Sequence, residues 1–68
     1  MKVSEILQSP MVNDFTMIHI SKQTSLNHYK EFFGNWYADQ VMDYADNEIM
    51  KLEYLENENK IRMEVKES

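Results

Sequence analysis

The chain has 68 residues and no cysteine, and these two facts together limit how it can fold. Without cysteine, neither a disulfide bond nor a thiolate metal site can stabilise it. A chain of this length buries only about 60 % of the surface that its unfolded form exposes. We therefore expect a single domain over residues 1–68 that folds by packing alone or by pairing with a second copy. The length also excludes a two-domain enzyme and most cofactor-binding folds.

The net charge of −5 lies in one part of the chain. Residues 31–50 contain no Lys or Arg, and their acids are Glu31, Asp39, Asp43, Asp46 and Glu48. An acidic surface repels free nucleic acid and anionic membranes, so we expect direct binding to neither. The expected partner is a protein with a basic surface, of the kind that nucleic-acid-binding proteins carry. No apolar run approaches the roughly 20 residues of a membrane span, and we expect a cytoplasmic location.

The first half of the chain predicts a short helix followed by two strands. Apolar residues at i, i+3 and i+4 favour a helix over residues 3–9, and Pro10 ends it. Residues 15–20 are rich in β-branched and aromatic types, with apolar side chains on both faces, which is typical of an inner strand covered on both sides. A polar turn at 21–25 leads to a return strand over 27–33, or to a loop in a three-stranded alternative.

A second, amphipathic helix is predicted over residues 36–46. At about 100° per residue, Asp39, Asp43 and Asp46 share one face and form a single acidic stripe. The opposite face is apolar and comprises Tyr37, Ala38, Val41, Tyr44 and Ala45. The stripe fits either a partner-binding surface or a solvated helix face. Acids near the end of a helix are unfavourable by about 0.3–1 kcal/mol, which favours the first alternative.

The last third predicts a hairpin, with alternating strands at 48–55 and 60–66 joined by a turn at 56–59. The order of elements is then α-β-β-α-β-β. We expect an α+β two-layer sandwich, with a three- to four-stranded antiparallel sheet and both helices on one face.

This layout resembles a type of small accessory protein from phages and prophages of Gram-positive bacteria. The pieces that carry the resemblance are Met1-Lys2-Val3-Ser4-Glu5-Ile6-Leu7, Ile49-Met50-Lys51-Leu52-Glu53-Tyr54 and Lys60-Ile61-Arg62-Met63-Glu64-Val65. They span nearly the whole chain, but they match in patterning only. The resemblance implies an accessory protein that binds and blocks a host protein, and it carries over no functional residue.

The candidate binding surface combines the acids of residues 31–50 with nearby apolar side chains, which are typical anchors at interfaces. It comprises Glu31, Phe33, Trp36, Asp39, Met42, Asp43, Asp46 and Glu48. Trp36 fits either this surface or a core position over the sheet edge. His19 and His28 lack the spacing of a metal site, and no cofactor or catalytic motif is present.

The leading hypothesis is a non-enzymatic inhibitor or modulator of a host protein. Its most concrete form is an anti-defence inhibitor of the anti-CRISPR or DNA-mimic type. Two alternatives stay open: a homodimeric structural or assembly protein, and an antitoxin-like binding partner.

Overall fold

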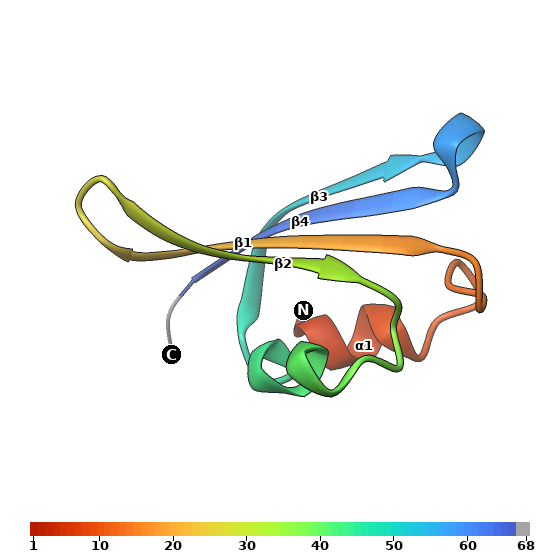
Figure 1. Cartoon of the computed structure of the whole chain (residues 1–68), viewed down its shortest axis with the longest axis horizontal. Coiled ribbons are helices and arrows are strands. Elements are labelled where there is room, and N and C mark those ends of the chain that lie inside the picture. The colour runs from red at the N-terminus through yellow and green to blue at the C-terminus, as the bar shows by residue number, and fades with distance from the viewer. Residues whose placement is uncertain (67–68) are drawn as a thin grey trace.

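The structure is a computed structural model that describes residues 1–66, and its main element is a four-stranded sheet (Figure 1). The strands are β1 (Met17–Ser25), β2 (His28–Gly34), β3 (Glu48–Leu55) and β4 (Lys60–Lys66). Their order across the sheet is β2-β1-β4-β3. Two antiparallel hairpins, β1–β2 and β3–β4, meet along a parallel pairing between β1 and β4. The sheet is therefore mixed, with β1 and β4 at its centre.

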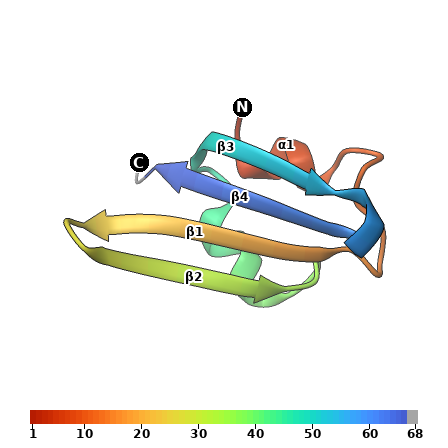
Figure 2. The same cartoon turned by 90° about the horizontal axis from the view of Figure 1, so that it is seen from above.

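One face of the sheet is covered by a layer of two short helices, α1 (Val3–Leu7) and the 3₁₀ helix η1 (Asp39–Tyr44) (Figures 1 and 2). The core lies between these layers, because alternate residues of each strand point toward the helices. Its buried side chains are Val3, Ile6, Ile18, Ile20, Phe32, Val41, Tyr44, Ile61, Met63 and Val65. Gly34 ends β2 beside this core, and a Cβ there would lie 2.9 Å from Cζ of the Phe32 ring.

The opposite face of the sheet is open, so the prediction of an inner strand covered on both sides is wrong. Met17 is exposed on this face, and Phe15 before it is exposed as well. His19 is buried there because the Phe33 ring stacks on it with 4.1 Å between ring centroids. Its Nε2 lies 3.3 Å from Oε1 of Glu31 on the neighbouring strand. Cross-strand neighbours thus cover the imidazole.

The predicted antiparallel sheet with two helices is also wrong. The structure is mostly sheet, its central pairing is parallel, and its helical parts are the five residues of α1 and short 3₁₀ turns. Alternation fixes which side chains share a face, but it does not say which strands are neighbours. The polar segment 21–25 belongs to β1, and the turn follows it at Leu26 and Asn27, where Asn27 adopts a left-handed φ of 67°.

A second left-handed residue ties the sheet to the loop after α1. Asn59 follows the 3₁₀ turn η2 (Glu56–Glu58) with a φ of 49°. Its Oδ1 accepts a hydrogen bond of 3.0 Å from Oγ1 of the fully buried Thr16, and Thr16 Oγ1 accepts one of 3.0 Å from the Asn13 amide. The hydrogen bonds fix the entry into β1 beside the start of β4.

Candidate functional site: an apolar groove with an acidic rim

The segment 36–47, which contains η1, repeats with a period of three. Several backbone hydrogen bonds in it join an amide to the carbonyl three residues earlier, as from Val41 to Ala38 at 3.1 Å and from Ala45 to Met42 at 3.2 Å. A 3₁₀ helix has about three residues per turn, so side chains at i and i+3 lie over one another. The segment therefore has three rows of side chains.

Burial separates the core row from the other two, and position beside α1 separates the groove row from the outer row. The core row is buried or half-buried, the groove row faces α1 from across a depression, and the outer row is exposed. The core row comprises Ala38, Val41, Tyr44 and Asn47; the groove row comprises Trp36, Asp39, Met42 and Ala45; the outer row comprises Tyr37, Gln40, Asp43 and Asp46. The core row anchors the segment, and this leaves the groove row free to form a surface.

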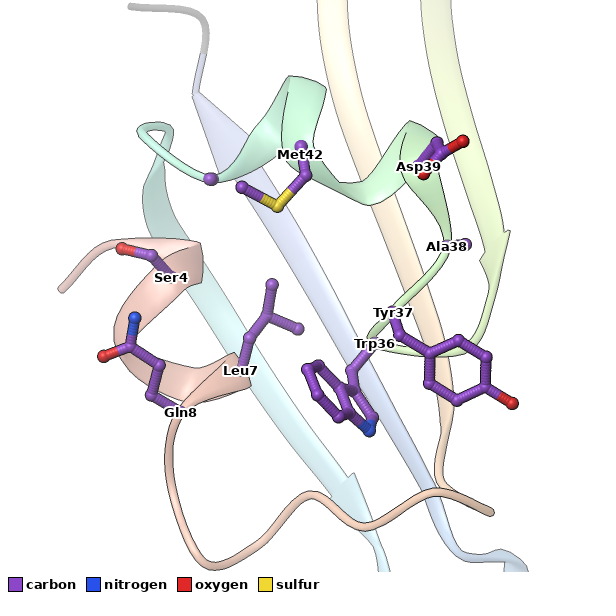
Figure 3. A pocket seen from close by; sticks show the side chains of 9 residues that line it. Ser4, Leu7, Gln8, Trp36, Tyr37, Ala38, Asp39 and Met42 are labelled. Carbon is purple, nitrogen blue, oxygen red and sulfur yellow. The ribbon is translucent and has the colours of Figure 1, made fainter.

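The groove lies between α1 and the groove row and has a volume of about 340 Å³ (Figure 3). Leu7 extends into it from α1, and Trp36 and Met42 face Leu7 from the other side. Ser4 and Gln8 line the α1 edge, and Tyr37 and Ala38 also contribute. The exposed fraction of the Met42 side chain is 67 %, so a ligand in the groove would cover apolar surface that water now contacts.

Two contacts orient the indole of Trp36. Its Nε1 donates a hydrogen bond of 3.2 Å to Oδ1 of Asp14, and its ring meets the Tyr37 ring edge-on at a centroid distance of 5.6 Å. The contact with Asp14 brings a second carboxylate close to the groove besides Asp39. Among the groove-lining residues that the structure describes, none is Lys or Arg. The groove is thus apolar inside with an acidic rim.

The structure brings together only part of the predicted surface. Trp36, Asp39 and Met42 line the groove. Glu31 and Phe33 lie on the open face of the sheet, where both contact His19. At the edge strand β2 they also line a second depression, together with Asp43 of η1, so the structure groups these three residues apart from the groove.

The expected acidic stripe is absent from the segment 36–46. Asp39 and Asp43 would lie about 40° apart around an α-helix, but they lie about 120° apart around a 3₁₀ helix. Accordingly, Asp39 lines the groove, whereas Asp43 and Asp46 belong to the outer row. Asp43 instead lies beside Tyr44, and the pKa of the Tyr44 hydroxyl is raised by burial and by the charge of Asp43.

Glu48 has a structural contact. Its Oε2 lies 3.0 Å from the amino group of Met1, and the Ile49 amide donates a hydrogen bond of 2.8 Å to the Met1 carbonyl. The hydrogen bond from the Met1 amino group, and then its charge, lower the pKa of the Glu48 carboxyl. The pair joins the start of α1 to the start of β3.

Sequence reasoning missed part of the groove, chiefly Leu7, Ser4, Gln8, Tyr37 and Ala45. The helical spacing predicts that Leu7 and Ala45 lie on apolar helix faces that pack on the sheet. A signal for the groove was present in the spacing of Trp36, Asp39, Met42 and Ala45 at intervals of three. That spacing fits a 3₁₀ helix and drifts around an α-helix.

Comparison with known proteins identifies no relative: no family model, no curated protein and no solved structure matches the chain. Within residues 1–66, no helix has the length and apolar character that crossing a bilayer requires. The basis for a functional assignment is therefore the groove and its charge.

Proposed function

We propose that the chain is a non-enzymatic protein-binding module and that the groove is its binding site. The partner segment presents a large apolar side chain with Lys or Arg beside it. The observation that carries this proposal is the groove row, where Trp36 and Met42 face Leu7 across an open apolar depression. Aromatic and Met side chains are enriched at protein interfaces, and anchors in such pockets contribute most of the binding energy.

The dimensions and charge of the groove define this ligand. A volume of about 340 Å³ is at the lower end of the range for ligand pockets, and it suits one or two apolar side chains. Burying a Leu or Phe side chain contributes about 1.5–3 kcal/mol. Asp39 and Asp14 then favour a cation next to the anchor, because complementary charge speeds association and selects the partner. The same two carboxylates repel a partner segment that carries Asp or Glu beside its apolar anchor.

The biological setting of this binding is part of the proposal. The resemblance to phage and prophage accessory proteins favours a host protein as the partner and inhibition as the outcome, in the cytoplasm of the host cell. A DNA mimic would need its carboxylates in one row, like the phosphates of a DNA strand, but Asp39 and Asp43 lie on different sides of η1. We therefore place the contact at the groove. An anti-defence role then depends on binding an apolar side chain of the target protein in the groove.

The test uses two synthetic peptide probes that share a central Leu-Phe pair, one flanked by Lys and the other by Glu. Each is titrated into the ¹⁵N-labelled protein and followed by NMR. The Trp36 indole N–H is a unique reporter because the chain has one Trp. We expect the Lys probe to shift the Trp36 indole and Leu7 signals and to bind at least about tenfold more tightly than the Glu probe.

Two exposed methionines on different parts of the molecule provide the matched control. Met42 lines the groove, whereas Met50 lies on β3 with a similar exposed fraction of 70 %. Met42→Ala should weaken binding of the Lys probe about tenfold, and Met50→Ala should leave it unchanged. Equal affinity for both probes, or shifts centred on the open face of the sheet, would overturn the proposal.

A further inference from the structure

The β1–β2 hairpin forms an arm that projects past the helical layer (Figures 1 and 2). We define the arm as residues 22–30, of which residues 23–30 are all exposed. Its two strands pair through Gln23 and Tyr29 and turn at Leu26 and Asn27. Lys22 and Lys30 at its base lie near Tyr44 of η1, whereas the exposed side chains from Gln23 to Tyr29 are free to contact another molecule.

Leu26 is an unusual residue for the tip of this arm. Tight turns favour Gly, Pro, Asn, Asp and Ser, each for its backbone geometry or local hydrogen bonds. Asn27 fits this rule with its left-handed φ of 67°, but Leu26 provides neither property. Its side chain is 81 % exposed, so it adds nothing to the core. An apolar side chain held at the end of a projecting hairpin is suited to enter an apolar groove.

The charge of the arm is opposite to that of the groove. Residues 15–30 contain no Asp or Glu, whereas residues 31–50 contain no Lys or Arg. Lys22 and Lys30 lie directly opposite each other on β1 and β2, an arrangement of like charges that disfavours strand pairing. Their Nζ atoms lie 5.9 and 5.7 Å from the Tyr44 ring centroid, at the base of the arm.

We propose that the arm of a second copy of this chain occupies the groove. Leu26 of one molecule enters between Leu7, Trp36 and Met42 of the other. This inference rests on the proposed function of the groove, and it names a ligand that the chain itself carries. The arm has the required chemistry, since an apolar side chain is flanked by two lysines and no acid.

The geometry requires two molecules. Within one molecule the arm points away from the helical layer, so its tip does not meet its own groove (Figures 1 and 2). A strand rises about 3.3 Å per residue, which places Lys22 and Lys30 about 13 Å from Leu26. The molecule is 20 Å across its shorter axes, which exceeds this separation. To face the acidic rim of the partner copy at Asp39, the ammonium groups of Lys22 and Lys30 turn away from Tyr44 of their own molecule.

The arm and an external partner then compete for the same groove. Self-association would hold the groove occupied until a segment with a stronger anchor displaces the arm. Binding of the partner therefore becomes weaker as the concentration of the protein itself rises.

The test mixes two variants that each lack one half of the contact. Leu26→Asn removes the anchor and places a turn-favouring residue at the tip, so folding is preserved or improved. Met42→Lys blocks the groove at an exposed position. Sedimentation velocity over a concentration series measures self-association, and native mass spectrometry with one variant ¹⁵N-labelled identifies mixed species. Circular dichroism confirms that both variants are folded.

We expect the wild-type protein to self-associate and each single variant to do so at least about tenfold more weakly. The mixture should form dimers that contain one molecule of each variant, because the arm of Met42→Lys can enter the groove of Leu26→Asn. A monomeric wild type, or a mixture without mixed dimers, would overturn the inference. If the Lys probe still binds the groove in that case, the proposed function stands and only the arm is excluded; if it fails to bind as well, both are overturned.

Discussion

The separation of the core row from the groove row in η1 can be tested at two adjacent residues, Val41 and Met42. Val41 belongs to the core row and is 0 % exposed, whereas Met42 belongs to the groove row. Val41→Ala removes two buried methyl groups at about 0.8 kcal/mol each and leaves part of their volume as a cavity. The expected loss is about 2 kcal/mol of the free energy of unfolding. Met42→Ala removes a side chain that is mostly in water, so the expected loss is under about 0.5 kcal/mol.

The difference between the two expected losses of stability is large for a chain of 68 residues, whose total free energy of unfolding is about 3–10 kcal/mol. Urea denaturation followed by circular dichroism gives the free energy of unfolding, and an unchanged m-value confirms that both variants unfold from the same native state. A thermal melt should show Val41→Ala about 10 °C below the wild type. The same two proteins, titrated with the Lys probe, should show the reverse order, with binding weakened in Met42→Ala and retained in Val41→Ala. Equal losses of stability at both positions would refute the assignment of the rows.

Two further tests concern the turns and the amino terminus. Asn27→Gly should be neutral or stabilise the fold by up to about 0.5 kcal/mol, since Gly adopts a positive φ without strain. Asn59→Gly should lower the free energy of unfolding by about 1–2 kcal/mol, because the Thr16 hydroxyl loses its acceptor. Urea denaturation of both variants measures these changes, and a gain of stability in Asn59→Gly would contradict the role of this hydrogen bond. The lowered pKa of Glu48 means that its contact with the Met1 amino group stabilises the fold above the unfolded pKa and loses this effect as the pH falls through the folded value. Stability measured from pH 6 to pH 3 should therefore fall less steeply in Glu48→Gln than in the wild type, and parallel curves would show that the contact contributes nothing.

The sequence predicts the positions of individual elements better than it predicts their arrangement. The short helix over residues 3–9 corresponds to α1, the return strand over 27–33 to β2, and the last hairpin to β3 and β4. In β4 the alternation of Ile61, Met63 and Val65 is the signal, and all three are buried. The sequence does not predict the polar end of β1, because residues 23–25 are exposed and lack an apolar pattern.

The second helix shows why the site was harder to predict than the fold. Val41 and Tyr44 are three residues apart, a spacing that places two side chains on one face of an α-helix and of a 3₁₀ helix alike. Both helix types therefore predict the same buried pair, and the buried pair is correct. The helix types differ only in where they place the remaining residues. A rotation of about 100° per residue groups Asp39 with Asp43, whereas in the structure Asp39 lines the groove together with Met42.

The parallel pairing of β1 with β4 has a consequence for the order in which the chain folds. Each hairpin is local and can form within microseconds, but the pairing that joins them places Met17 beside Lys60. Closing so long a loop lowers the chain entropy before any contact is gained, so we expect this step to limit the folding rate. During synthesis, β1 and β2 emerge from the ribosome before β4 does. Until β4 arrives, the inner edge of β1 and the apolar face around Ile18 and Ile20 lack their cover, and this interval is when the chain is most exposed to aggregation.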